Sequence, residues 1–324
     1  GLDPETNYFF KIFPYNGIES FINYKTDESV PETSAITDKL IAGLQIDNTT
    51  TKFIIDFDNT IEHVNNGQFK GDGFNPEPSV GQLNSNAWAA TGFRDEDLDF
   101  GDTKESDDYN RGFNPGTTST AGIWAFEVSE ENHALGVKPG ASTFTPGSIT
   151  LRMQNQTGET LTSINYSYIV YIFNNQDRGN SFNFSHSADN ITFTPVGDLD
   201  FKSDAPKDSD PEWKAYYRTG KIFDINVDDG DFYYFRWDGN DLDGSGSRDA
   251  FALDDITVIA NTTEPLVIEG EFEEVVLAEN AEIVISEFNQ LTVRGKLANN
   301  AGNEGLIIEH GGSLLHESDG VPAT

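Results

Sequence analysis

The chain has 324 residues, and its 20 basic side chains stand against 55 acidic ones, which gives a formal net charge of -35. This charge repels nucleic-acid phosphates and anionic membrane surfaces. The chain has no cysteine, so disulfide frameworks and thiolate zinc sites are excluded. No apolar run approaches the roughly 20 residues that a membrane-spanning helix needs. We therefore expect neither nucleic-acid binding nor membrane insertion.

The first part of the chain predicts a small β-rich piece followed by a linker. Within residues 1–37, the run NYFFKIFPYN alternates aromatic and polar side chains, and the run NYKTDESVPETSAIT has the Pro and Thr content of an extended segment. The only helix-like pattern, ITDKLIAGL at residues 36–44, is short and ends in glycine. Residues 38–52 are accordingly assigned as a linker.

Residues 53–262 predict one all-β domain. Apolar and alternating runs follow one another at short spacing, separated by clusters of Gly, Asn, Asp and Pro; among them are FIIDFDN, SITLRMQN, SINYSYIVYIFN, KIFDINV, DFYYFRW and FALDDITVIA. Many strands with turn residues between them indicate two packed antiparallel sheets. The predicted fold class is therefore all-β, with a jelly-roll β-sandwich as its main domain.

Residues 264–324 differ in character from the sandwich. Short apolar pairs recur around Val275, Ile283, Leu291 and Leu306, with Gly or Asn at the bends. Such a loose recurrence is typical of coils that bury their apolar residues against neighbouring coils. We expect a short β-solenoid-like segment that continues beyond residue 324.

Two adjacent carboxylates in the run RDAFALDDITVIA point to a cation. Successive side chains of a strand face opposite sides, so Asp254 or Asp255 must share the face of the apolar Ala252. A buried carboxylate is costly unless a cation or hydrogen bonds compensate it. Asp56 and Asp58 lie on one face of the first strand of the domain, and carboxylates from two neighbouring strands suit calcium. We expect a structural calcium site at Asp56, Asp58, Asp254 and Asp255, with turn capping or pairing to arginine as the alternative.

Aromatic and arginine side chains are the candidates for ligand binding. A tryptophan face stacks on sugar C–H groups, and planar donors fix sugar hydroxyls. Among the four tryptophans, Trp88 and Trp213 lie among polar neighbours and are expected to be exposed, whereas Trp124 is expected in the core. The candidate ligand-binding residues are Trp88, Trp213, Tyr109, Arg111 and Arg178. The alternative for each tryptophan is a place in the core.

Catalytic motifs are missing from the sequence. The five histidines form no H-E-x-x-H pattern, no G-x-S-x-G elbow lies between a strand and a helix, and no G-x-x-x-x-G-K phosphate loop is present. A carboxylate pair with the separation found in glycosidases cannot be assigned among 55 acidic residues. The sequence therefore favours a protein that is not an enzyme.

The order and spacing of several motifs resemble a β-sandwich module of secreted Bacteroidota proteins. The similarity covers roughly residues 53–260 and includes LNSNAWAATGF, YNRGFNPGTTSTAGIWAFEV and DFYYFRWDGNDLDGSGSRDAFALDDITV. The N-terminal GLDPETNYFFKIFPYN, with Tyr8, is similar to the last strands of a fibronectin type III domain. The tail from LTVRGKLANN onward resembles the segment that often precedes a type IX secretion sorting domain. The resemblance implies export by the type IX secretion machinery and an extracellular or cell-surface location.

The sequence thus predicts a non-catalytic extracellular module for adhesion or glycan binding, with a glycan or another cell-surface ligand as its partner and the flanking pieces as spacers. An architectural segment that presents or helps export an absent hydrolase or nuclease domain is the alternative. An enzyme acting on polysaccharide is a third and weaker hypothesis, because the sequence assigns it no catalytic residues.

Overall fold

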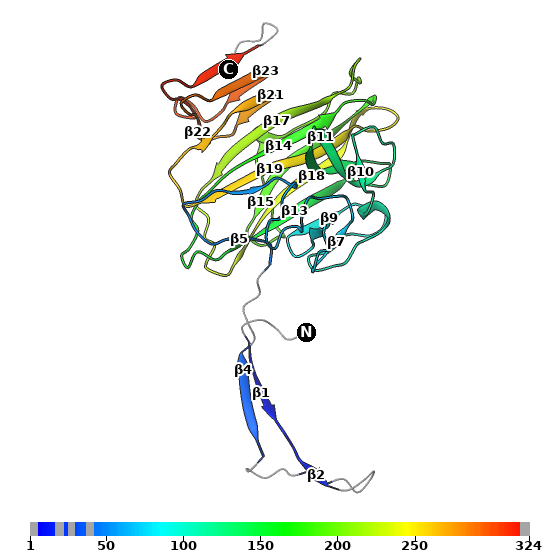
Figure 1. Cartoon of the computed structure of the whole chain (residues 1–324), viewed down its shortest axis with the longest axis vertical. Coiled ribbons are helices and arrows are strands. Elements are labelled where there is room, and N and C mark those ends of the chain that lie inside the picture. Colours follow the sequence, from blue (N-terminus) through cyan, green and yellow to red (C-terminus); the bar gives the residue numbers. More distant parts are fainter. Residues whose placement is uncertain (1–5, 17–22, 25–29, 37–41, 318–324) are drawn as a thin grey trace. The chain divides into compact units, whose positions relative to one another are not determined.

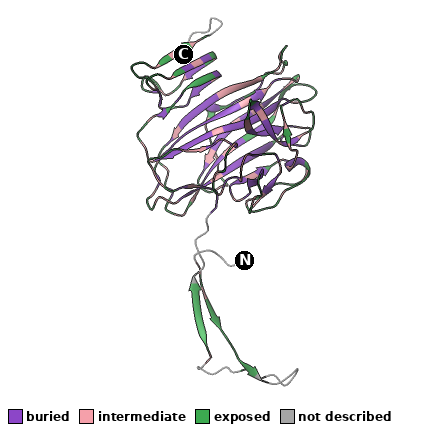
Figure 2. Cartoon of the chain, in the orientation of Figure 1, coloured by how far each residue is buried: buried purple, intermediate pink, exposed green. Residues whose placement is uncertain are grey.

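The computed structural model of the chain describes residues 6–16, 23–24, 30–36 and 42–317. The chain divides into two compact units, Gly1–Ile41 and Ala42–Thr324. In the first unit, β1 (Asn7–Lys11) pairs antiparallel with β4 (Glu32–Ile36), and β2 (Tyr15–Asn16) pairs with β3 (Asn23–Tyr24). The described side chains of this unit are mostly exposed (Figure 2). Its similarity to part of a fibronectin type III domain stays a prediction.

The second unit is built on two β-sheets (Figure 1). The larger has the order β10-β11-β12-β19-β14-β17-β21-β23-β25, with β6 paired to β19. Its strands within the sandwich are β6 (Phe53–Ile55), β10 (Phe113–Asn114), β11 (Gly122–Ser129), β12 (Asn132–Lys138), β14 (Ile164–Phe173), β17 (Trp213–Ile222) and β19 (Ala250–Ala260). The smaller sheet has the order β16-β15-β18-β13-β5, with β9 paired to β13. Its strands are β5 (Leu44–Ile46), β9 (Trp88–Thr91), β13 (Gly147–Asn155), β15 (Arg178–Ser187), β16 (Thr194–Pro195) and β18 (Phe232–Gly244).

The core lies between these two sheets because each strand turns alternate apolar side chains inward. On β14 the inward residues include Tyr166 and Tyr168, whose rings pack against Phe184 at centroid distances of 4.8 and 5.3 Å. The ring of Trp237, on β18, lies 5.5 Å from that of Tyr168. The predicted all-β sandwich is confirmed. Among the described residues no helix is long and apolar enough to cross a membrane.

The sandwich begins earlier than residue 53. Strand β5 lies inside the stretch expected to be a linker, yet Leu44 and Ile46 are buried. The strand adds to the small sheet by pairing in parallel with residues 153–155 of β13. The linker assignment over residues 38–52 is wrong at this strand, because three residues are too few for a period-2 pattern to be recognised.

The first and last sandwich strands named by the sequence lie side by side, as expected. Strand β6 pairs antiparallel with β19, with Ile55 opposite Ile256 and Phe53 opposite Val258. A β-bulge interrupts β19 next to this pair, since Ser167 of β14 pairs with Thr257 whereas Ile169 pairs with Asp254. The extra residue reverses the alternation of faces. Asp254 therefore shares the face of Ala252, as the alternation predicted, whereas Ile256 and Val258 beyond the bulge lie on the opposite face.

The C-terminal strands pair in parallel and alternate between two sheets. Strands β21 (Gly270–Leu277), β23 (Gln290–Asn299) and β25 (Ser313–His316) extend the larger sheet, because β21 pairs in parallel with β17. Strands β20 (Leu266–Val267), β22 (Ile283–Ile285) and β24 (Leu306–Ile308) form a separate three-stranded sheet. Apolar residues such as Val275 and Leu291 are buried between these strands. Strands β21, β23 and β25 therefore share a continuous sheet with the sandwich.

The remaining elements lie in the connections of the second unit. Strand β7 (Phe74–Asn75) pairs in parallel with β8 (Leu83–Asn84). Two 3-10 turns, η2 (Asp107–Tyr109) and η3 (Gly197–Leu199), precede β10 and the 200–208 loop respectively. The η3 turn lies beside β21. It is hydrogen-bonded to the residues that follow this strand, since the backbone N–H of Glu279 donates to Asp198 Oδ2 at 3.2 Å. The 200–208 loop is thereby held near the C-terminal strands.

Candidate functional site

Two of the residues expected to meet a ligand lie in the core. Trp88 is 0% exposed and its ring packs 5.7 Å from that of Phe57. Tyr109 is also 0% exposed, and its hydroxyl donates to the carbonyl of Glu96 at 2.7 Å. The expected exposure of Trp88 is therefore wrong, because Phe57, which packs on its ring, comes from another segment of the chain.

The two arginines are engaged by carboxylates. Arg111 pairs with the buried Asp108 and its Nε donates to the carbonyl of Ala121 at 2.9 Å. Arg178 pairs with Asp241 at 2.8 Å. Arg111 therefore fixes a loop of the sandwich, whereas Arg178 joins β15 to β18, and the two guanidinium groups lie in separate clusters of contacts. Their predicted role in ligand binding stays a prediction.

Trp213 and Trp124 lie on the outer face of the larger sheet, and both are half-buried. The indole N–H of Trp213 donates to the carbonyl of Pro115 at 3.0 Å, and its ring lies 5.2 Å from that of Phe126. The ring of Trp124 stacks on that of Phe126, with their centroids 6.3 Å apart. The expected core position of Trp124 is thus only partly right. The five candidate ligand residues do not form one surface, because they divide between the core, two ion pairs and this outer face.

The four predicted metal-binding aspartates are close enough for their charges to interact. Asp254 is 1% exposed, and its Oδ1 accepts the N–H of Asp255 at 2.9 Å. Burial, followed by repulsion from Asp255 and Asp58, raises the pKa of Asp254 well above its usual value. Burial and repulsion from Asp56 and Asp58 likewise raise the pKa of Asp255. The four aspartates that the sequence analysis grouped therefore lie near one another.

Their remaining contacts favour hydrogen bonding over a cation cage. Oδ1 of Asp56 accepts the N–H groups of Asp58 and Asn59, both at 3.1 Å, as in a capped turn. Oδ1 of Asp58 accepts the backbone N–H of His133 at 3.1 Å. Across the described part of the chain, no group of three or more His, Asp and Glu side chains is arranged to hold a metal ion. Structural calcium stays a prediction.

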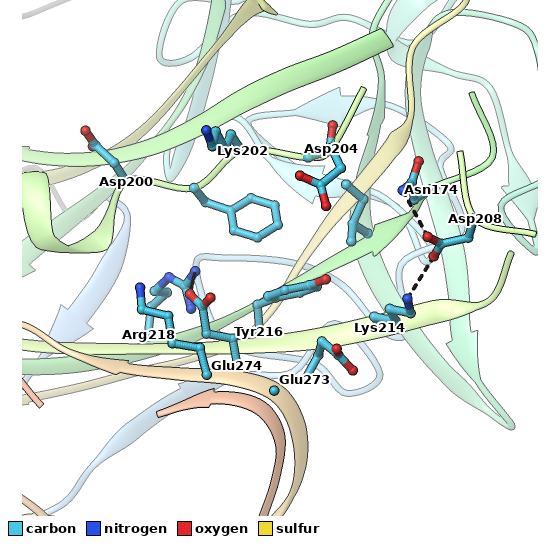
Figure 3. A pocket seen from close by; sticks show the side chains of 15 residues that line it. Asn174, Asp200, Lys202, Asp204, Asp208, Lys214, Tyr216, Arg218, Glu273 and Glu274 are labelled. Atoms are coloured by element: carbon cyan, nitrogen blue, oxygen red, sulfur yellow. Dashed lines mark hydrogen bonds and ion pairs between the residues drawn. The ribbon is translucent and has the colours of Figure 1, made fainter. Parts of the chain in front are cut away.

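A polar cleft of about 410 Å³ lies where the sandwich meets the C-terminal strands (Figure 3). Along β17, Trp213, Ala215 and Tyr217 face outward, so the alternate residues of the strand face inward. These inward side chains form one wall of the cleft, and the 200–204 segment forms the facing wall. Strands β21 and β23 close it from the C-terminal side. The lining side chains from these elements are Lys214, Tyr216, Arg218, Asp200, Phe201, Lys202, Ser203, Asp204, Glu273, Glu274 and Lys296.

Aromatic rings and a buried arginine shape the floor of the cleft. The ring of Tyr216 packs 4.7 Å from that of Phe201. The guanidinium of Arg218, which is 1% exposed, lies 5.4 Å from the Phe201 ring and donates to Glu274 Oε1 at 2.6 Å. Because Arg218 is on β17 and Glu274 on β21, this ion pair joins the sandwich to the C-terminal strands. The floor is therefore fixed by packing and by an ion pair whose arginine is buried and whose glutamate is partly exposed.

The other end of the cleft is fixed by Asp208. Its Oδ2 accepts from Lys214 Nζ at 2.8 Å, and its Oδ1 accepts from Asn174 Nδ2 at 3.2 Å. In Figure 3 the Asp204 carboxylate points into the space between the two walls, on the side facing Tyr216. Side chains held in this way present hydrogen-bonding groups at set positions, which is what a binding site for a polar ligand requires.

The electrostatic environment around Tyr216 is negative. Burial and the nearby carboxylates of Glu273, Glu274, Asp208 and Asp204 raise the pKa of the Tyr216 hydroxyl. The hydrogen bond to Asp208 raises the pKa of Lys214, so its ammonium is charged at neutral pH. Burial raises the pKa of Asp200. The cleft thus offers both hydrogen-bond donors and acceptors beside an aromatic floor, a combination suited to hydroxyl-rich ligands.

Sequence reasoning missed this cleft, although one signal was available. In the strand WKAYYRTGKI, Lys214 and Arg218 occupy the same face as Tyr216. Charged residues on the inward face of a buried strand indicate an uncovered or polar part of the core. The partners of that face, from the 200–204 segment and from β21, are distant in sequence and left no local signature.

No protein-family model matches the chain, and no curated protein matches it. Among solved structures, the K3 adhesin domain of Lys-gingipain from Porphyromonas gingivalis is similar at 9% identity and a TM-score of 0.28, over 42% of this chain and 78% of that one. A carbohydrate-binding module specific for non-crystalline cellulose is similar at 8% identity and a TM-score of 0.30, over 61% and 97%. A carbohydrate-binding module in complex with β-1,4-galactotriose is similar at 12% identity and a TM-score of 0.26, over 45% and 86%. These sequence identities and TM-scores are too low to assign a function to this chain. Its function is therefore inferred from the cleft described above.

Proposed function

We propose that this chain is a non-catalytic extracellular module for adhesion through glycan binding, and that the cleft at the junction of β17, β21 and the 200–204 segment is its binding site. The observation that carries the proposal is the aromatic floor of Tyr216 and Phe201, surrounded by fixed donors and acceptors. A sugar ring has an apolar C–H face and a rim of hydroxyls. That surface matches an aromatic ring bordered by charged hydrogen-bonding groups.

The charged groups of the cleft support a neutral, hydroxyl-rich ligand. A sugar hydroxyl both donates and accepts hydrogen bonds, so it can bridge a carboxylate and an ammonium group that lie close together. The pair Lys214 and Asp208, at 2.8 Å, is such an arrangement. Asp204 and Glu273 add carboxylates to the same cleft. Because the existing pairs already order these side chains, binding costs little side-chain entropy.

The C-terminal strands belong to the proposed site. Glu273 and Glu274 of β21 and Lys296 of β23 line the cleft together with residues of the sandwich. We propose that residues 264–324 are a β-solenoid-like segment. It would complete the binding site in addition to serving as a spacer. The parallel pairing of β21 with β23 and of β22 with β24 supports this assignment.

The extracellular location, the type IX export route and the Bacteroidota origin are proposals that rest on the resemblance of the sequence. The net charge of -35 is compatible with an exported, soluble module. The alternative function is an architectural spacer that presents or helps export an absent catalytic domain. That alternative needs no cleft with ordered side chains, so ligand binding decides between the two.

Asp204→Asn is expected to weaken glycan binding by about tenfold, because it removes a charged acceptor from the cleft. Asp204 is exposed and no structural contact depends on its charge, so folding should not change. The matched control is Asp210→Asn, an exposed aspartate of the same connection that does not line the cleft. The measurement is a glycan array with the second unit as probe, followed by calorimetric titration of the best ligand with each variant.

Tyr216→Ala is the second variant, and it should abolish detectable binding of the same ligand because the aromatic floor is lost. Circular dichroism checks that the variant is folded. Equal affinities of the wild type and both cleft variants would refute the cleft as the site. Absence of binding by the folded wild type to every glycan of a broad array would favour the architectural spacer.

A further inference from the structure

A second hollowed region lies away from the cleft and shares none of its lining residues. Three hollows, of about 560, 510 and 360 Å³, follow one another along the surface. The first and second share His186, Thr194 and Phe223, and the second and third share Asp189 and Asn226. Hollows that share walls adjoin each other. Together they form one elongated depression, here called the Phe223 groove.

Phe223 stands between the first two hollows. It follows the last residue of β17 directly, and its side chain is 44% exposed although the preceding Ile222 is buried. Lys221 Nζ lies 5.0 Å from the centroid of the Phe223 ring. Single exposed aromatic residues are common on protein surfaces. Phe223 differs from such residues because it lines both of the first two hollows. A ligand that lies along the groove would therefore contact its ring.

The walls beside Phe223 are held by hydrogen bonds. Nδ1 of His186 lies 2.7 Å from the hydroxyl of Tyr233, and the two rings are stacked. Burial lowers the pKa of His186, so this side chain is neutral at pH 7. Oδ1 of Asp189 accepts the N–H groups of Ile191 and Thr192, both at 2.8 Å, which fixes the turn between the second and third hollows. The walls of the groove are therefore fixed by contacts within the chain.

Two observations decide what kind of polymer fits. An extended peptide would add to a sheet edge, but the edge strand at the groove, β16, has only two residues and one is Pro195, which has no N–H to donate. A polyanion is disfavoured because the carboxylates that line the groove would repel it, and Lys221 is the only lysine or arginine among the lining residues. Those carboxylates are Asp189, Asp198, Asp224, Asp231 and Glu279. A neutral chain with apolar faces and many hydroxyls meets both conditions.

We propose that the Phe223 groove binds a neutral, linear oligosaccharide, with the Phe223 ring against one sugar and the neighbouring sugars in the adjoining hollows. This site is additional to the cleft and does not depend on the function proposed for it. With both sites on one compact unit, a long polysaccharide that reaches both would be held more tightly than by either site alone.

The test uses Phe223→Trp as a reporter within the whole chain. Hexasaccharides of β-1,4-linked glucose, xylose and mannose are the probes, with a hexasaccharide of galacturonic acid as the charged comparison. We expect at least one neutral hexasaccharide to shift the tryptophan emission of Phe223→Trp, and the emission of the wild type to change less. The disaccharide of the same sugar should bind about tenfold more weakly, because it cannot fill the adjoining hollows.

Phe223→Ala should bind that hexasaccharide about tenfold more weakly than the wild type in calorimetry. Phe288→Ala, which removes another exposed phenylalanine outside the groove, should leave the affinity unchanged. The cleft variant Asp204→Asn should leave the emission shift of Phe223→Trp unchanged, so failure at one site is distinguished from failure at the other. The proposal is overturned if no neutral hexasaccharide shifts the emission, or if the Phe223→Ala and wild-type proteins bind it equally.

Discussion

Asp254→Asn is expected to raise the melting temperature of the second unit by several degrees at pH 7.5. Asp254 is buried, and its carboxylate accepts hydrogen bonds from the backbone N–H of Asp255 and from the side chain of Asn132, which an asparagine oxygen can also accept. The substitution removes a charge that burial and the neighbouring Asp255 and Asp58 make unfavourable. We expect the free energy of unfolding to increase by about 1–3 kcal/mol, the typical desolvation penalty of a buried polar group. Thermal unfolding followed by circular dichroism measures the change.

The same reasoning fixes the pH dependence of this gain. The pKa of Asp254 is raised in the folded chain relative to the unfolded chain. Folding therefore favours the protonated form, and the stability contributed by Asp254 falls as the pH rises from its unfolded pKa through its folded pKa. The advantage of Asp254→Asn should be largest above the folded pKa and should vanish near pH 4. Asp243→Asn, the same charge change at an exposed site, is the control and should show little effect.

Calcium binding would reverse the sign of this result. A cation bound by Asp254 and Asp58 would favour their charged forms, and a ligand held only by the folded state stabilises it. In that case Asp254→Asn would lower the melting temperature in calcium-containing buffer, and a chelator would lower the melting temperature of the wild type by several degrees. A stabilised variant together with a wild-type midpoint that a chelator leaves unchanged would identify the aspartates as hydrogen-bonded carboxylates that bind no calcium.

Glu274→Ala should destabilise the second unit by about 3–5 kcal/mol, the range found when one partner of a buried ion pair is removed. The Arg218 guanidinium would lose its 2.6 Å contact with Glu274 while remaining almost fully buried. The two side chains belong to β17 and β21, so the loss also loosens the attachment of the C-terminal strands. Urea unfolding at pH 7 measures the change in the free energy of unfolding.

The double variant Arg218→Met, Glu274→Leu should recover most of that stability, because it leaves no unpaired charge and keeps similar volume. Asp208→Ala is the matched control, since it breaks the ion pair between Lys214 and Asp208. In that pair the side chain of Lys214 is 30% exposed and that of Asp208 is 27% exposed. A pair of that exposure is expected to contribute no more than about 1 kcal/mol. Similar losses for Glu274→Ala and Asp208→Ala would contradict the importance assigned to the buried pair.

The candidate site was less predictable than the fold because its parts come from separate segments. Tyr216 and Arg218 stand on one strand, where the alternation of side chains hinted at a polar inward face. The 200–204 segment and Glu274 reach that face only through the packing of η3 and the parallel pairing of β17 with β21. The misplacement of Trp88 has the same origin, since Phe57, which covers it, lies about thirty positions earlier in the chain.

The sequence by itself determined the all-β architecture, the neighbouring positions of the first and last sandwich strands and the burial of one aspartate of the Asp254–Asp255 pair, because alternation of apolar side chains and turn residues are local properties. Only the tertiary structure decided which aspartate is buried, since a bulge opposite β14 reverses the faces of β19. It also decided where a ligand can bind, because a cleft exists only once distant strands are packed side by side and its walls carry no pattern that a single segment can show.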